Sequence, residues 1–273
     1  MPELPEVETV RQELESFLIG RKVTEIENPS NLGLRKPVNW PKEKIGISGV
    51  SRWGKRLFIN LGDEKHFDVS LGMTGSFRRE KCYRPKLHDH VVFRLEDQKL
   101  ESSPIARGVH LIYNDPRRFG WIQYRSEAPV MKGWDPILSS SIEKKELIQK
   151  MKSSKKDLYS FLMDQTHIVG LGNIYVQEAL FRAKAYPFKR AHKTSYKKLS
   201  LIIDKAQEVL REALNHKGTT IINYKSATGQ QGGFQNKLQV YGKTNLDKCS
   251  LCTGPLKKVK KARSVSFCRY CQK

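Results

Sequence analysis

The sequence predicts an α+β protein of several domains: an N-terminal helix with an antiparallel β-sandwich, then a helical domain, then a small C-terminal hairpin. Three observations support this prediction. The chain of 273 residues is long enough for two domains and a small appendage. Its apolar residues change from short alternating runs to helical spacing in the second half, and four of its five cysteines lie in the C-terminal tail.

The first element is a helix predicted over residues 2–18, because apolar residues recur on one face before Gly20 ends the pattern. These residues are Val7, Val10, Leu14, Phe17 and Leu18. From residue 22 to about residue 125, short apolar runs alternate with turns, as at 56–61, 90–95, 109–113 and 121–124. Several strands at this spacing indicate an antiparallel sandwich.

The second half begins after a predicted linker at residues 128–136, which contains two prolines and a glycine. Three helical stripes follow: Leu158, Phe161 and Leu162; Val176, Leu180 and Phe181; and Leu199, Ile202, Ile203, Ala206, Val209, Leu210 and Leu214. Gly218 and residues 229–233 mark the exit into a polar stretch. The predicted domains are therefore residues 1–127, 137–236 and 237–273, with the linker between the first two.

The C-terminal tail carries a metal-binding pattern. Cys249, Cys252, Cys268 and Cys271 form two C-x2-C pairs separated by 15 residues. Two such pairs predict one structural Zn²⁺ ion, held in a closed tetrahedron with no open position for catalysis. The tail is therefore predicted to be a zinc-finger β-hairpin. The fifth cysteine, Cys82, stands alone and is interpreted as an ordinary thiol.

The charge and hydropathy of the chain indicate which class of partner and which cellular compartment to expect. A formal net charge of +22 and an isoelectric point near 9.8 favour a polyanionic partner, most commonly nucleic acid. A solvated surface or a ribosomal-type scaffold would show the same excess. The sequence contains neither an apolar run of 18 residues nor a basic-then-apolar leader, so neither a membrane span nor secretion is expected. Reduced cysteines then fit the cytoplasm.

The N-terminus offers a nucleophile. Removal of Met1 would leave Pro2 with a secondary amine, and an α-amino group ionises near pH ~8 whereas a lysine ionises near ~10.4. Attack of this amine on a sugar C1′ would give a cationic iminium, which is the electron sink that strand cleavage by elimination requires. Glu3 is placed beside it as a proton donor or acceptor. The same residues also suit a simple acidic helix start.

Motifs along the whole chain resemble the bacterial formamidopyrimidine-DNA glycosylases, which excise oxidised purines from DNA. They are PELPEVE at 2–8, LGMTG at 71–75, HDH at 88–90, DPRRFG at 115–120, GLGNIY at 170–175, LQVYGK at 238–243 and the four-cysteine tail. The resemblance implies a glycosylase that is also an abasic-site lyase. It implies a helix–two-turns–helix element, one zinc ion, damaged double-stranded DNA as the partner, and a monomer associated with the bacterial nucleoid.

The resemblance also implies roles for individual residues. Pro2 and Glu3 would carry the chemistry, with Lys55 and Arg263 as assistants; Met73, Arg117 and Phe119 would fill the gap left by an extruded base. Lys55, Asn173 and Arg263 would grip phosphates, with Lys155 and His88 as further DNA contacts, and Glu6, Thr219 and Thr220 would take part in lesion recognition. Taken singly, Met73 and Phe119 could be core residues, Lys55 and Arg263 surface charges, and His88 a structural histidine.

Three positions depart from the family pattern. Ser70 stands where a histidine is usual, Tyr159-Ser160 stand where many relatives have Lys-Pro, and His167 replaces an aliphatic residue. Lys155 and Lys156 lie close enough to supply the missing charge. Two other hypotheses remain open: a glycosylase for oxidised pyrimidines with the same amine, disfavoured by Leu4, and a basic zinc protein that binds damaged DNA without cutting it.

Overall fold

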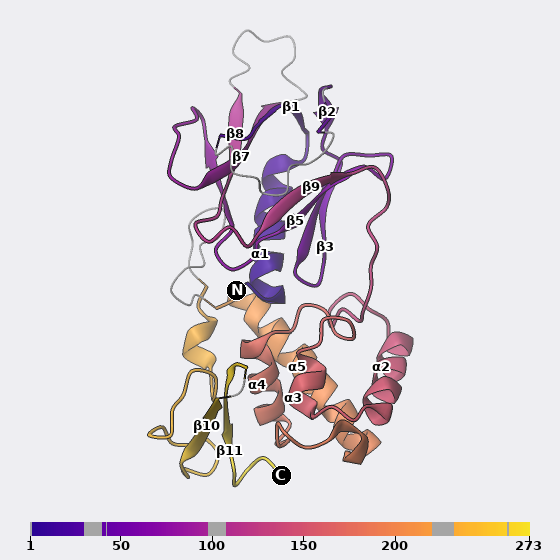
Figure 1. Cartoon of the computed structure of the whole chain (residues 1–273), viewed down its shortest axis with the longest axis vertical. Coiled ribbons are helices and arrows are strands. Elements are labelled where there is room, and N and C mark those ends of the chain that lie inside the picture. Colours follow the sequence, from indigo (N-terminus) through magenta and orange to yellow (C-terminus); the bar gives the residue numbers. More distant parts are fainter. Residues whose placement is uncertain (1, 30–39, 42, 98–107, 220–231, 261) are drawn as a thin grey trace. The chain divides into compact units, whose positions relative to one another are not determined.

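The computed structural model of the chain describes residues 2–29, 40–41, 43–97, 108–219, 232–260 and 262–273. It comprises two compact units (Figure 1). The first contains Met1–Met131 and Lys217–Gly233, and the second contains Lys132–His216 and Phe234–Lys273. The finer four-part division stays a prediction.

The first unit combines one helix with two antiparallel sheets. Helix α1 spans Leu4–Leu18, so Pro2 lies just ahead of it and Glu3 is its N-cap. The strands are β1 (Arg21–Glu27), β2 (Ile45–Gly46), β3 (Gly49–Trp53), β4 (Arg56–Asn60), β5 (His66–Ser70), β6 (Ser76–Glu80), β7 (Asp89–Asp97), β8 (Val109–Asn114) and β9 (Trp121–Arg125). They form one sheet of order β2-β1-β7-β8-β6 and one of order β3-β4-β5-β9.

The core of this unit is shared by α1 and the inner faces of both sheets. All five apolar residues predicted for the helix face are buried in it, from Val7 to Leu18. Alternation puts Leu57, Ile59, Val69 and Ile122 on the same side of their sheet. The helix is tied to β3 by Arg52, which donates from Nε to Glu8 at 2.8 Å.

The second unit is helical and carries the C-terminal hairpin (Figure 1). Its helices are α2 (Ser141–Ser153), α3 (Leu158–Leu162), α4 (Asn173–Arg182) and α5 (Tyr196–Asn215), with short 3₁₀ turns at Ala191–Lys193 and Phe234–Lys237. Strands β10 (Leu256–Lys260) and β11 (Ser264–Cys268) form the hairpin. The predicted stripes are buried apart from Leu214, which is half-buried.

One buried carboxylate joins the tail to the helical part. Glu178 on α4 is fully buried and accepts backbone N–H groups from Gln239, Val240 and Tyr241 at 2.9–3.1 Å. At the other end of the tail, Gln272 donates to the carbonyl of Ala185 at 2.8 Å. Because a buried carboxylate must be matched by donors, this arrangement determines where the 238–243 motif lies on α4.

The fold class predicted from the sequence is confirmed: an N-terminal helix, antiparallel sheets, a helical region and a C-terminal hairpin with clustered cysteines. Helix α2 has no counterpart among the predicted stripes, because only Leu147 and Met151 of its residues are buried. Across the described ranges, no helix is long and apolar enough to cross a membrane.

Candidate functional site

The start of α1 brings Pro2 and two buried carboxylates together. Pro2 is buried immediately before the helix, and the side chains of Glu3 and Glu6 are 4% and 2% exposed. Glu6 Oε2 accepts the backbone N–H of Glu3 at 2.8 Å, which holds the turn that carries Pro2. The predicted removal of Met1 concerns a residue outside those that the structure describes.

Glu6 also forms a hydrogen bond with the segment that follows α5. Its Oε1 accepts the backbone N–H of Thr219 at 2.7 Å, and Thr219 is buried. Gly218 has φ +79°, and a Cβ there would lie 2.7 Å from Glu6 Oε1, so this position requires glycine. The structure therefore brings together Glu6 and Thr219 of the predicted lesion-recognition group, while Thr220 lies outside the described residues.

Lys55 lies at the end of the first unit that carries Pro2. Gly54 and Lys55 form the two-residue turn between β3 and β4, and Gly54 has φ +59°. Strand β3 runs antiparallel to α1: Arg11 donates to the carbonyl of Val50 at 3.2 Å, and Arg52 donates to Glu8. Moving from Val50 to Arg52 along β3 therefore corresponds to moving from Arg11 back to Glu8 on α1, toward the helix N-terminus. The β3–β4 turn that carries Lys55 lies at that end of the helix (Figure 1).

Met73, Arg117 and Phe119 lie on two loops that one buried carboxylate connects. Asp115 is fully buried; it accepts the hydroxyl of Thr74 on one loop and the backbone N–H of Gly120 at 2.8 Å on the other. Arg117 donates its backbone N–H to the Thr74 hydroxyl at 3.1 Å. Because Thr74 follows Met73 directly, this bond brings the two loops side by side.

Close backbone packing reinforces this connection. A Cβ at Gly72 would lie 2.4 Å from the backbone nitrogen of Gly120, so the loops approach more closely than any side chain permits. The three predicted side chains remain on the surface: Met73 is 36% exposed, Phe119 is 58% exposed, and the Arg117 guanidinium lies 5.0 Å from the Phe119 ring centroid. Neither Met73 nor Phe119 is a core residue.

His88 and Ser70 flank the same loops. His88 is half-buried with φ +71°, and its carbonyl accepts the backbone N–H of Asp115 at 3.1 Å. Ser70 ends β5; its carbonyl accepts the Tyr113 hydroxyl at 3.2 Å and its hydroxyl accepts the Gly72 N–H at 3.4 Å. Ser70 therefore supports the turn that carries Met73.

Replacing Asp115 with asparagine is expected to destabilise the protein by about 1–3 kcal/mol, because the amide can accept on only one side and leaves a buried donor unsatisfied. Denaturant unfolding measures this difference. The exposed Asp63 offers a control, since Asp63→Asn makes the same charge change outside the buried loops. Equal unfolding midpoints for both variants would contradict the assigned role of Asp115.

In the second unit, Asn173 and the tip of the C-terminal hairpin are neighbours. Asn173 is the first residue of α4, where backbone N–H groups lack helical partners and suit an anion. Its Nδ2 donates to the carbonyl of Ser264 at 3.4 Å. Arg263 precedes Ser264 and is exposed, with no ion pair to the residues that the structure describes. Two of the predicted phosphate contacts are thus adjacent.

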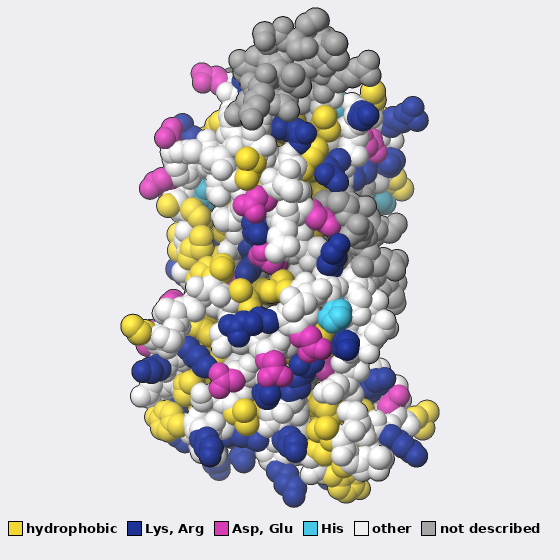
Figure 2. Space-filling model, turned by 180° about the vertical axis from the view of Figure 1, so that it is seen from behind, with side chains coloured by type: hydrophobic (Ala, Val, Ile, Leu, Met, Phe, Trp, Pro, Cys, Tyr) yellow, Lys and Arg dark blue, Asp and Glu magenta, His cyan; other side chains and the backbone are white. Residues whose placement is uncertain are grey.

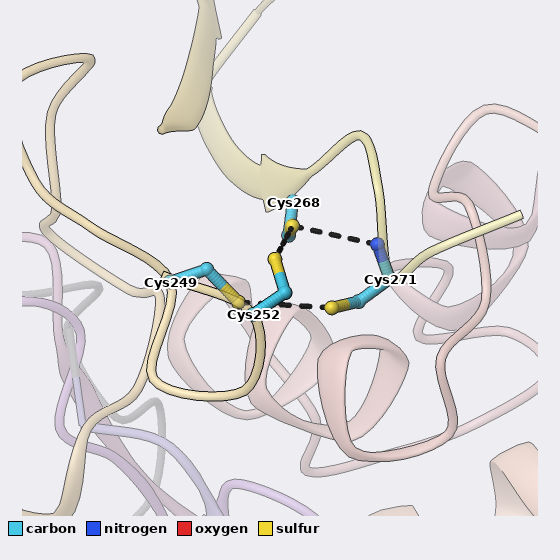
Figure 3. A group of neighbouring side chains, drawn as sticks. All are labelled: Cys249, Cys252, Cys268 and Cys271. Carbon is cyan, nitrogen blue, oxygen red and sulfur yellow. Dashed lines mark hydrogen bonds between the residues drawn. The ribbon is translucent and has the colours of Figure 1, made fainter. Parts of the chain in front are cut away.

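The four tail cysteines converge on one point (Figure 3). Their Sγ atoms lie within 4.8 Å of one another, with Cys249–Cys271 at 3.8 Å and Cys252–Cys268 at 3.5 Å. A tetrahedral Zn²⁺ with Zn–S bonds of about 2.3 Å requires S–S separations of about 3.8 Å, so the four thiols fit such an ion. They form no disulfide. Cys82 is exposed and lies outside the cluster.

The electrostatics of this cluster also favour a cation. Burial, followed by hydrogen bonds to neighbouring cysteine sulfurs, raises the pKa of the Cys271 thiol to about 12. A divalent cation bound among the four sulfurs would stabilise the thiolate form of their ligands. The group can therefore hold a metal ion.

The positions that depart from the family pattern have structural partners. His167 stacks on Phe161 with ring centroids 4.8 Å apart, so it packs against the helical core. Lys156 donates from Nζ to Asp164 Oδ2 at 2.6 Å, so the Asp164 carboxylate balances the charge of Lys156. Lys155 is exposed and has no such acidic partner within the described part of the chain. Of the two lysines, Lys155 is thus the one available to an anion.

The charge excess is visible on the surface. On the face shown in Figure 2, Lys and Arg side chains outnumber acidic ones at the foot of the view, where they alternate with hydrophobic side chains. The hairpin contributes Lys257, Lys258 and Lys260 on β10, all exposed. Such a surface attracts a polyanion and makes its binding sensitive to salt.

Comparison with known proteins agrees with this geometry. Residues 1–122 match the family model described as the formamidopyrimidine-DNA glycosylase N-terminal domain, and residues 133–225 match that of the formamidopyrimidine-DNA glycosylase H2TH domain. The chain belongs to the formamidopyrimidine-DNA glycosylase family. It is accordingly a DNA glycosylase of base-excision repair.

Individual members of the formamidopyrimidine-DNA glycosylase family match over their whole length. The protein of that name from Lactococcus lactis subsp. cremoris is 37% identical, covering 100% of this chain and 99% of the relative. The one from Photobacterium profundum is 37% identical with 100% coverage of both. A Lactococcus lactis variant bound to Fapy-dG-containing DNA superposes with a TM-score of 0.86 at 34% identity, covering 100% of both chains. A complex with abasic-site DNA gives 0.85 at 34% identity, covering 99% of each chain.

Several residues that position the predicted DNA contacts within each unit were not identified from the sequence. They are Thr74 and Asp115 between the two loops, and Tyr159 and Gln177 around Asn173. Asp115 and Thr74 lie inside the quoted motifs DPRRFG and LGMTG, so membership of a motif was the available signal. Gln177 had none, because a glutamine on an apolar helix looks like an exposed residue.

Proposed function

We propose that the protein excises oxidised purines such as 8-oxoguanine and formamidopyrimidines, and then cleaves the strand, using the N-terminal amine of Pro2. The observation that carries this proposal is the position of Pro2: it lies directly before α1, beside the buried Glu3 and at the end of the unit that carries Lys55. A nucleophile and a proton-transfer group are thereby adjacent.

The reaction follows from these groups. The Pro2 nitrogen lone pair forms a bond to C1′ while the bond from C1′ to the base breaks, and the amine proton passes to the departing base. Glu3 then protonates the ring oxygen as the sugar opens and the iminium forms. The resulting iminium withdraws electrons, so a base removes the C2′ proton and the 3′ phosphate leaves. A second elimination releases the 5′ phosphate. Lys55 assists the proton transfers, whereas Arg263 binds phosphate first because arginine is a poor proton donor.

The other predicted residues hold the DNA. Met73 and Phe119 enter the space left by the extruded base, and Arg117 hydrogen-bonds the orphaned partner base. Asn173, Arg263, Lys155 and His88 contact the sugar-phosphate backbone, which sets the register without reading sequence. Glu6 and Thr219, already joined by a hydrogen bond, take part in lesion recognition with Thr220.

The metal in this proposal is one structural Zn²⁺ held by the four tail cysteines. Bound there, the ion would stiffen the β10–β11 hairpin. Arg263 lies just before β11, so its guanidinium would be positioned for DNA. The protein acts as a monomer in the cytoplasm, next to bacterial-type nucleoid DNA.

A substrate comparison tests the lesion class. The protein is expected to cleave duplexes containing 8-oxoguanine at least about tenfold faster than duplexes containing thymine glycol, since specificity follows the ratio of kcat/KM values. Gel-resolved strand cleavage under single-turnover conditions measures both rates, with an undamaged duplex as the control. Preference for thymine glycol would instead assign the protein to oxidised pyrimidines.

A further inference from the structure

The side chain of Asn173 is held by two donors at the start of α4. Its Oδ1 accepts the hydroxyl of Tyr159 at 2.7 Å and Nε2 of Gln177 at 2.7 Å. Tyr159 is on α3 and is 7% exposed. All three residues belong to the second unit, so the arrangement depends on that unit alone.

Backbone groups determine which way these amides face. The N–H of Ser266 can only donate, and it bonds Gln177 Oε1 at 2.7 Å. Gln177 Nε2 must then be the atom that bonds the carbonyls of Asn173 at 3.0 Å and Ser264 at 3.1 Å, which can only accept. The two hydrogens of Gln177 Nε2 are shared among these carbonyls and the Asn173 side chain, so the Asn173 atom facing them must be the oxygen.

The opposite side of the Asn173 amide consequently presents hydrogens. One N–H of Nδ2 donates to the carbonyl of Ser264 at 3.4 Å, at the surface of the protein. The other makes no hydrogen bond to any residue in the described ranges. A phosphate oxygen is an acceptor, so this N–H can bind it, whereas a reversed amide would place an oxygen against the phosphate.

We propose that Tyr159 is a positioning residue: together with Gln177, its hydroxyl holds the amide of Asn173 turned so that Nδ2 can donate to a DNA phosphate. The inference rests on the proposed function of Asn173. Tyr159 stands at the position where many relatives have lysine, and its hydroxyl is neutral. Its contribution would therefore be to orient the Asn173 amide, and it would not add positive charge for the phosphate. This role requires no contact between DNA and Tyr159, which is 7% exposed.

A phenylalanine substitution separates the hydroxyl from the ring. Tyr159→Phe keeps the buried ring in place and removes one donor to Asn173. The expected result is an affinity about fivefold weaker for a duplex with a tetrahydrofuran abasic-site analogue, the factor that corresponds to one neutral hydrogen bond. Fluorescence anisotropy at one fixed salt concentration measures the Kd. Tyr196→Phe is the matched control, because it removes a tyrosine hydrogen bond to Gln149 on other helices and should leave the Kd unchanged.

A double-mutant cycle tests whether the hydroxyl acts through Asn173. Asn173→Ala is expected to weaken binding more than Tyr159→Phe does, and adding Tyr159→Phe to it should have no further effect. The dependence of affinity on salt should match wild type in all three variants, since none removes a cation. An unchanged Kd for Tyr159→Phe, additive effects in the cycle, or an altered salt dependence would each overturn the inference.

The proposed function can fail separately. Wild-type protein that binds the abasic-site duplex no better than undamaged DNA, and cleaves neither 8-oxoguanine nor abasic sites, would overturn the proposed function. Wild-type activity together with a defective Asn173→Ala and an unaffected Tyr159→Phe would overturn only the role of Tyr159.

Discussion

Pro2→Gly is expected to lower strand cleavage at 8-oxoguanine by about a thousandfold or more, the size of effect seen when a nucleophile is replaced. Glycine provides a primary amine on a more mobile backbone. The protonated imine that it forms still carries a proton on nitrogen and can lose it, so the positive charge that proline would keep permanently is lost. Borohydride trapping measures the intermediate directly: wild type should form a covalent adduct with lesion-containing DNA, and Pro2→Gly should form almost none.

Glu3→Gln provides the matched variant at the neighbouring position. It keeps the shape of a side chain that is 4% exposed and removes its ability to donate a proton. A loss of about 10²–10⁴-fold is expected, the usual contribution of general acid–base catalysis. Both variants should bind the tetrahydrofuran duplex as wild type does, because that ligand undergoes no chemistry. Full-speed cleavage by protein whose intact mass still includes Met1 would contradict the role of Pro2.

Cys268→Ser is expected to abolish binding of the proposed Zn²⁺ ion and to weaken DNA binding by about tenfold or more. Cys268 ends β11 and is fully buried among the four sulfurs, so a hydroxyl there leaves an incomplete ligand set. The hairpin then loses the constraint that holds Ser264 beside Asn173 and Arg263 at its tip. Metal content by atomic absorption and the Kd for abasic-site DNA are the two measurements.

Cys82→Ser serves as its control, since Cys82 is exposed and outside the cluster. This variant should retain one zinc ion per chain and wild-type affinity. Circular dichroism of Cys268→Ser should keep most of its helix signal, because α2 to α5 have their own buried residues. Loss of all folded signal would show that the hairpin is integral to the second unit and is not an appendage.

The helices and strands that the sequence predicted well are those with a regular apolar period. The stripe from Leu199 to Leu210 became α5, and the alternation at residues 109–113 became β8. Helix α2 was not predicted because most of its surface faces solvent. Its capping box, in which Ser140 and Glu143 bond each other's backbone N–H, was a local signal that could have located its start.

The cysteine spacing, the charge excess and the order of the motifs are properties of the sequence alone, because local periodicity and ligand spacing need no partner from elsewhere in the chain. The contacts that orient the site depend on tertiary structure. Thr74 meets Asp115 across 41 residues, Tyr159 meets Asn173 across 14, and Glu6 meets Thr219 across 213. Such pairs form only when packing brings distant segments together, and a hydrogen bond that depends on that packing leaves no periodic trace in the sequence.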